Sequence, residues 1–280
     1  MAENVLETGE CVSNRRSPPA FFLLTVLLSV PFLLFAGTPL PGPANLPVSA
    51  LMLVCPGLAG AILVFREEGG GGVRRLVGRV ADFRKIGAAW YLPILFLMPA
   101  IMLISYGAAL FSGRPLPADP FVPYLTIPVF VLLFFVAGAF EEVGWTGYAT
   151  DPLQERWSAL LTALIIGAVW AAWHSIPWIQ QNSPVWAAGQ ALSTVALRVL
   201  IVWLYNNTRG SVFAASLFHG MVNVSEFSFP NYGSHYDPVV TGVITLAVAV
   251  VVTYLWGAET LARWRHGRRR IGETRRRLRG

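Results

Sequence analysis

Long apolar segments separated by short polar ones make up most of the chain between residues 20 and 256. A helix that crosses a bilayer needs about 20 largely apolar residues. Eight segments meet that need, and we predict a spanning helix in each: 20–37, 46–65, 86–111, 121–140, 158–179, 184–205, 210–229 and 238–256. The pattern therefore predicts an all-α polytopic membrane protein, in which polar residues resume abruptly at Glu141 after the fourth span.

The connection between the second and third spans has a pattern of its own. Its glycine run, Gly69–Gly72, predicts a flexible linker. Apolar residues then recur at helical spacing with arginines between them, namely Val73, Leu76, Val77, Val80 and Phe83 with Arg74, Arg75, Arg79 and Arg84. We interpret this stretch as an amphipathic helix that lies in the membrane interface.

Loop charge predicts the orientation of the spans, because basic residues concentrate in cytoplasmic loops. The connections 38–45, 112–120, 180–183 and 230–237 contain a single basic residue, Arg114. The two chain ends and the connections 66–85, 141–157 and 206–209 contain all the other Lys and Arg residues except Arg198. Eight spans with both termini in the cytoplasm fit this asymmetry.

Composition excludes a soluble protein. Charged residues make up 13% of the chain and hydrophobic residues 55%, whereas a soluble domain has about 25% charged residues. The mean hydropathy is +0.56. A chain so poor in charge cannot cover a water-exposed surface, and we expect a multi-pass protein of the cell membrane.

The chain has a net charge of +6, and its basic residues are concentrated after residue 262. Basic tails beside apolar helices are topology signals and contacts to anionic lipids. We therefore expect membrane lipids, and no nucleic acid, as partners. The expected organisation is a cytoplasmic tail over 1–19, a transmembrane domain over 20–256 and a basic cytoplasmic tail over 257–280, with no indication of oligomeric state.

Ionisable residues inside the predicted spans are the candidates for function, because each costs at least about 2.5–3.5 kcal/mol in the membrane. Glu141 and Glu142 close one apolar run. Two neighbouring carboxylates in apolar surroundings are candidates to accept a proton from water. The alternative is an interfacial pair that marks the end of a helix.

Two histidines and an asparagine follow in later spans. His174 lies one turn after Trp170 and is either a satisfied core residue or a ligand. His219 and Asn223 are four residues apart, so both leave one face of a helix. They could bind a metal or donate to an oxyanion, although such pairs also join helices. Glu226 either extends this stripe or lies at the outer rim.

Arg198 stands alone in the sixth span, where it could pair with a buried carboxylate such as Glu142 or reach an interface. Hydrolysis of an amide needs a base for the water, a donor or cation for the oxyanion, and an acid for the leaving amine. The carboxylates, histidines and asparagine between residues 141 and 223 can supply all three. The same set would also suit a metal-ion transporter.

Three sequences in these spans resemble the motifs of a known family. They are Glu141-Glu142-Val143-Gly144-Trp145, Trp170-Ala171-Ala172-Trp173-His174 and His219-Gly220-Met221-Val222-Asn223. Their order and their placement on successive helices are similar to those of the CPBP intramembrane proteases, also called Abi or CAAX-protease-like, over a motif core of 121–228. That family includes prenyl-protein endopeptidases and bacterial proteins tied to bacteriocin processing or self-immunity.

The resemblance implies a polar cavity open to the cytoplasmic side. In it, Glu141 and His174 would activate the attacking water, and His219 and Asn223 would stabilise the oxyanion. In a metal-dependent variant, Glu141, His174 and His219 would bind zinc instead. The residues alone do not decide between these two forms.

This chain departs from the family pattern at one place. Position 146 is Thr146, where the first motif has an arginine that is expected to hold the second glutamate. Glu142 then needs another cation, for which Arg156 and Arg198 are candidates, or it is protonated with Thr146 as a neutral partner.

Three functions remain open on the sequence. The first is an endopeptidase that cleaves a membrane-associated or lipidated peptide. The second is an inactive relative that serves as a membrane scaffold or a bacteriocin immunity factor. The third is a pathway for protons or small cations, although the outer halves of the helices look too apolar for it.

Overall fold

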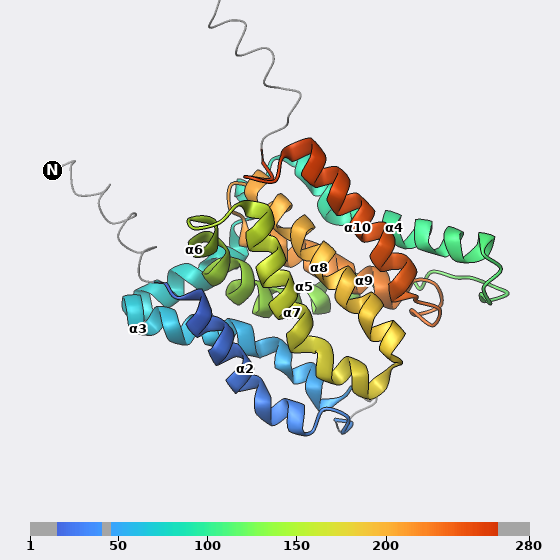
Figure 1. Cartoon of the computed structure of the whole chain (residues 1–280), viewed down its shortest axis with the longest axis horizontal. Helices are drawn as coiled ribbons and strands as arrows, with labels where there is room; N and C mark the ends of the chain where they lie inside the picture. The colour runs from blue at the N-terminus through green and yellow to red at the C-terminus, as the bar shows by residue number, and fades with distance from the viewer. Residues whose placement is uncertain (1–15, 41–45, 263–280) are drawn as a thin grey trace, which may run out of the picture.

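The computed structural model describes residues 16–40 and 46–262, and within them it contains helices and no strand (Figure 1). The α-helices are α2 (Pro18–Leu34), α3 (Cys55–Gly78), α4 (Tyr91–Phe111), α5 (Ile127–Gly144), α6 (Asp151–Gln154), α7 (Ala159–Gln181), α8 (Pro184–Asn207), α9 (Val212–Ser228) and α10 (Pro238–Trp256). The described part also contains four short 3-10 helices, η1 (Val48–Val54), η2 (Arg79–Ala81), η3 (Phe83–Lys85) and η4 (Ala88–Trp90). A π-helical turn, η5 (Trp145–Thr150), follows α5. The predicted all-α class is confirmed.

All eight predicted spans contain a helix. Among the described residues, six helical segments are long and apolar enough to cross a membrane. The other two, α2 and α9, have 17 residues each, which is the lower limit for a spanning helix. The expected tails fall largely on residues 1–15 and 263–280, which lie outside the described part.

Polar side chains cap three of the helices that carry the candidate residues, and also α10. Ser158, Ser183 and Ser211 each accept a hydrogen bond from a backbone N–H in the first turn of α7, α8 and α9. Asp237 does the same for α10. Such caps satisfy donors that have no partner within the helix. These caps define the residue at which each helix begins.

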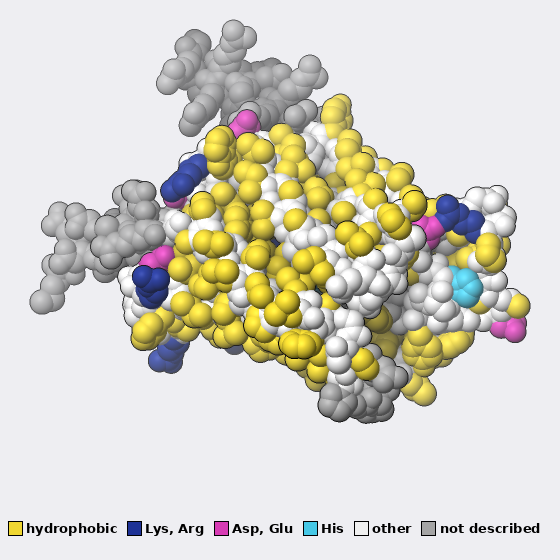
Figure 2. Space-filling view, turned by 60° about the horizontal axis from the view of Figure 1, so that its bottom comes forward, with side chains coloured by type: hydrophobic (Ala, Val, Ile, Leu, Met, Phe, Trp, Pro, Cys, Tyr) yellow, Lys and Arg dark blue, Asp and Glu magenta, His cyan; other side chains and the backbone are white. Residues whose placement is uncertain are grey.

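The core lies where α8 packs between α7 and α10, while α5 packs against α3 and α9 (Figure 1). Many large apolar side chains remain outside this core; Phe111 is 92% and Leu125 is 93% exposed. On the face shown in Figure 2, hydrophobic side chains cover the middle and charged ones lie toward the margins. Such a surface is stable only against lipid.

Two glycines allow α5 and α9 to approach closely. A Cβ atom on Gly220 would lie 2.9 Å from the backbone nitrogen of Phe135, and one on Gly138 would lie 3.0 Å from the carbonyl oxygen of Ser216. Small residues at a membrane helix interface permit this contact. It brings the end of α5, with its two glutamates, next to the middle of α9.

The fourth span begins and ends later than predicted. It starts at Ile127 rather than residue 121, because Pro120 and Pro123 keep the preceding chain out of the helix. It also continues past Glu141 through η5 to Gln154. The prediction of a loop is wrong over 141–154, where polar side chains find partners inside the protein, and the turn is confined to 155–158.

The glycine run after the second span is not a linker. Residues 70–78 continue α3, and only Gly69, with φ of 70°, leaves helical geometry and kinks the chain. Leu76 is buried, whereas Val77 and Phe83 are about half exposed (50% and 47%). The segment is thus an amphipathic helix, as predicted, and the kink at Gly69 separates it from the first part of α3.

Candidate active site

Glu142 and Arg198 form a fully enclosed ion pair in the site, and both are 0% exposed. Arg198 donates from Nη1 to Oε2 at 2.8 Å and from Nη2 to Oε1 at 3.0 Å, in a paired arrangement that fits a carboxylate. Arg198 of α8 therefore supplies the cation that Thr146 cannot, and Arg156 makes no such contact.

Two further donors complete the surroundings of Glu142. The Thr146 hydroxyl donates to Oε2 at 2.5 Å. His219 donates from Nδ1 to Oε1 at 2.9 Å, because a carboxylate already bound to a guanidinium only accepts hydrogen bonds. Glu142 thereby fixes the His219 ring and leaves Nε2 as the nitrogen available for chemistry.

Glu141, the neighbour of Glu142 in the last turn of α5, contacts other partners. It is 7% exposed, and its Oε2 accepts a hydrogen bond from Trp170 Nε1 at 2.9 Å. Its Oε1 has no hydrogen-bond partner among the described residues, and the residue lines a cavity. One carboxylate oxygen is thus held in place and the other can meet a water molecule.

His174 is oriented by its own helix and by aromatic neighbours. Its Nδ1 lies 3.1 Å from the carbonyl oxygen of Trp170, which can only accept, so Nδ1 carries a proton. The ring stacks on Trp178 at 5.1 Å with an interplanar angle of 10°. Nε2 is then an unprotonated acceptor in the neutral ring.

Trp170 connects these groups, a role that sequence reasoning missed. Its indole bonds Glu141, its carbonyl bonds His174, and its ring lies 4.4 Å from the guanidinium carbon of Arg198. The ring also meets His219 at 5.1 Å. The second motif has an aromatic residue at this position, and that was the signal in the sequence for a role of Trp170. Its partners lie on three other helices, and the sequence does not show which helices pack together.

One cavity of about 450 Å³ brings the predicted residues together. Glu141, His174, His219 and Asn223 all line it, and Glu142 lies behind His219. Glu226 lines it as well, so the polar stripe of α9 extends along the cavity wall. The positions agree with the predicted pocket, while the chemical roles of these residues stay predictions.

A second cluster of polar side chains lines the cavity, around the Tyr236 hydroxyl, and the sequence did not indicate it. The Tyr236 hydroxyl lies 2.8 Å from Gln190 Oε1 and 3.2 Å from Glu226 Oε1. Burial raises the pKa of the Tyr236 phenol well above its usual value, so this hydroxyl remains a donor at neutral pH. It joins α8, α9 and the connection before α10.

The predicted zinc ligands do not form a ready metal site. Within residues 16–40 and 46–262, no three His, Cys, Asp or Glu side chains are grouped so that they could hold a metal ion. Glu141, His174 and His219 share the cavity, and each keeps one atom, Oε1 of the glutamate or Nε2 of a histidine, that no described residue bonds. The zinc-dependent form stays a prediction.

Comparisons with known proteins agree with the three motifs. A family model described as Type II CAAX prenyl endopeptidase Rce1-like matches residues 123–225, which include all of them. The chain is also 26% identical over 266 residues to CAAX prenyl protease 2 of Methanococcus maripaludis. That match covers 86% of this chain and 95% of the relative. The predicted resemblance is confirmed, and it supports an intramembrane protease of the CAAX type.

Proposed function

We propose that this chain is an endopeptidase of the cell membrane that hydrolyses a peptide bond in a membrane-associated or lipidated peptide. Glu141 and His174 activate the attacking water, and His219 and Asn223 stabilise the oxyanion. The observation that carries the proposal is the meeting of these four side chains on one cavity inside a membrane domain.

The steps balance with the residues at hand. A water molecule donates one hydrogen bond to His174 Nε2 and loses its other proton to Glu141 Oε1 as its oxygen adds to the peptide carbonyl carbon. Asn223 donates its amide N–H to the resulting oxyanion, and His219, when protonated on both nitrogens, donates from Nε2. The C–N bond then breaks as Glu141 returns the proton to the leaving amine.

Glu142 and Arg198 act as positioning residues. Their buried ion pair holds the His219 ring through Nδ1. Arg198 also removes the main reason to expect an inactive relative, which was the missing motif arginine at position 146. The scaffold or immunity function is therefore not favoured.

The test is cleavage of a membrane-anchored peptide by purified protein. We expect Glu141→Gln and His174→Ala each to lose about 100-fold or more in rate, the range lost with a general acid or base. Glu259→Gln and His235→Ala change exposed residues of the same types and should keep wild-type rates. If both cavity variants remain folded and fully active, the proposed site is wrong.

A further inference from the structure

We propose that the cavity selects peptides with a basic side chain, lysine or arginine, and that Glu226 binds that side chain. That the ligand is a peptide rests on the proposed function, which this site narrows to one substrate class. Glu226 is a carboxylate of the cavity wall for which the hydrolytic steps have no use.

Glu226 is held on one side and open on the other. It follows His219 by seven residues on α9, nearly two turns, and so returns to nearly the same face of the helix. Its Oε1 lies 3.2 Å from the Tyr236 hydroxyl, and Gly233 packs so closely that a Cβ atom there would collide with the Glu226 carbonyl oxygen. Oε2 has no hydrogen-bond partner among the described residues, and it is therefore free to bind a ligand.

The charges that line the cavity favour a cationic ligand. Two carboxylates, Glu141 and Glu226, line it, and among the described residues no lysine or arginine does. The buried Arg198 guanidinium is already paired with Glu142 through both of its terminal nitrogens. A carboxylate withdrawn from water without a cation is costly. A basic side chain that enters the cavity therefore gains a partner in Glu226.

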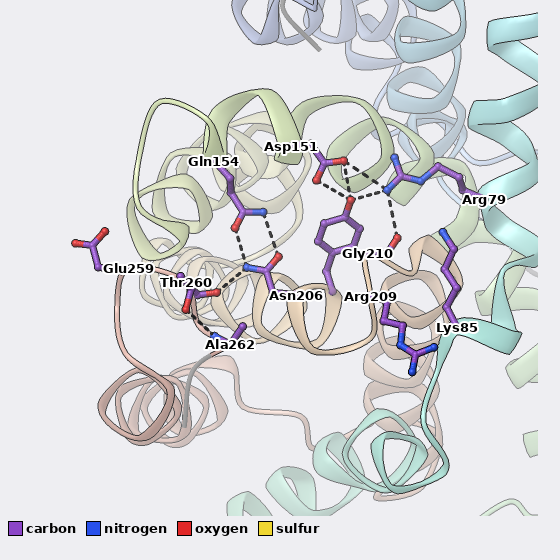
Figure 3. Close-up of a pocket in the computed structure, with 11 residues that line it drawn as sticks. Arg79, Lys85, Asp151, Gln154, Asn206, Arg209, Gly210, Glu259, Thr260 and Ala262 are labelled. Atoms are coloured by element: carbon purple, nitrogen blue, oxygen red, sulfur yellow. Dashed lines mark hydrogen bonds and ion pairs between the residues drawn. The ribbon is translucent and has the colours of Figure 1, made fainter. Parts of the chain in front are cut away.

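The polar pocket drawn in Figure 3 differs from the active-site cavity in this respect. Figure 3 shows Arg79, Lys85 and Arg209 in the same pocket as Asp151 and Glu259. An Arg79 nitrogen lies 3.6 Å from Asp151 Oδ2, and in the described chain this pocket shares no lining residue with the active-site cavity. The lack of a Lys or Arg partner for Glu226 thus contrasts with the pairing of acidic and basic residues in that pocket.

Aromatic rings of the cavity wall add to the attraction for a basic side chain. Trp186 and Tyr232 line the cavity with Tyr236, and the Trp186 and Tyr236 rings meet edge to face with centroids 6.4 Å apart. The faces of such rings attract ammonium and guanidinium groups. The methylene stem of a lysine or arginine also packs on apolar surface while its charged end reaches a polar partner. A carboxylate among aromatic rings therefore selects a long basic side chain over an acidic one.

The position of Glu226 along α9 determines where the basic residue stands in the peptide. Glu226 lies about 10 Å along the helix axis from His219, and the proposed steps place His219 at the cleaved bond. An extended peptide advances about 3.3 Å per residue. We therefore expect the basic residue about three positions from the bond that is cleaved.

Peptide binding to a protein that does not cleave tests the selection without requiring activity. Glu141→Gln protein in a non-ionic detergent is mixed with a palmitoylated, fluorescent, C-terminally amidated peptide of alanine and leucine. Each position of the peptide in turn is lysine or norleucine, which has the same stem without the ammonium group. We expect lysine at the favoured position to lower the dissociation constant about tenfold or more relative to norleucine, as a hydrogen bond to a charged group allows.

A matched pair of variants assigns the preference to Glu226. Added to the same background, Glu226→Gln should abolish the difference between the lysine and norleucine peptides. Glu259→Gln, the same substitution in the pocket of Figure 3, should leave the difference intact. Equal affinity for the two peptides, an undiminished preference in Glu226→Gln, or an equal gain wherever the lysine stands would overturn the proposal.

Cleavage of the same peptides by the protein with Glu141 intact separates this proposal from the proposed function. We expect the lysine peptide to have the higher kcat/KM, through a lower KM. If lysine strengthens binding as expected but no peptide is cut, the proposed function fails and the site for a basic side chain stands. If peptides are cut at rates that do not depend on lysine, the hydrolytic function stands and the proposal fails.

Discussion

At the scale of single residues, the pairing of Glu142 with Arg198 determines whether this chain can work despite its altered motif. The arginine of the family pattern would lie one helical turn after Glu142, whereas here the guanidinium comes from α8. The same charge reaches the same carboxylate by another route. That carboxylate in turn holds the His219 ring through Nδ1 at 2.9 Å.

We therefore expect Arg198→Ala to damage the protein severely, because removing one partner of a buried ion pair costs about 3–5 kcal/mol. Thermal unfolding in detergent and peptide cleavage would both show the loss. The double variant Arg198→Ala with Thr146→Arg returns the cation at the family position and should recover part of both. A double variant no better than the single one would mean that Arg198 does more than balance Glu142.

Sequence reasoning selected four side chains that the structure brings to one cavity, for a physical reason. Ionisable residues are rare in membrane helices, so Glu141, His174 and His219 stood out without any structure. It could not choose between Arg156 and Arg198, because that choice depends on which helices touch. It also missed Gln190 and Tyr236, which look like ordinary interfacial residues until the helix ends are brought together.

At the scale of helices, the crossing of α5 and α9 brings the first and third motifs together. Gly138 and Gly220 set their separation. The helical extension through η5 matters equally, because it keeps Thr146 on the face that meets Glu142. Hydropathy predicted where these helices lie, but it placed a loop at 141–157, since buried polar residues and loop residues look alike when their partners are unknown.

We expect Gly220→Ala to separate α5 from α9. The new Cβ would lie 2.9 Å from the backbone nitrogen of Phe135, and a backbone atom cannot move away as the end of a flexible side chain can. Overpacking of this kind costs about 1–3 kcal/mol, and the shift would also pull His219 from Glu142. Melting temperature and cleavage rate should both fall. Gly107→Ala in α4 is the matched control, since its Cβ would meet nothing within 4 Å; equal effects at the two positions would refute a role for this crossing.

At the scale of the whole molecule, a helix bundle with a largely apolar exterior encloses the cavity that Glu141, His174, His219 and Asn223 line. Loop charge predicts an orientation for the bundle, and that orientation stays a prediction. The full lining of the cavity could not be predicted, because it depends on which helices pack together.

Metal removal provides a test at this scale. Because the described His, Cys, Asp and Glu side chains form no group of three suited to a metal, we expect purified protein treated with a zinc chelator to keep its cleavage rate. Metal analysis of the same sample should find no stoichiometric zinc. Loss of activity on chelation, restored by added zinc, would instead favour Glu141, His174 and His219 as ligands.

The most direct test of hydrolysis by a water bound at Glu141 is cleavage in water enriched in heavy oxygen, with the products weighed by mass spectrometry. We expect the wild-type protein to place one heavy oxygen atom in the new carboxyl terminus of the peptide. Glu141→Gln, equally folded and incubated beside it, should yield no labelled product above background. Labelled product from Glu141→Gln at the wild-type rate, or a wild-type product without the heavy atom, would contradict the mechanism.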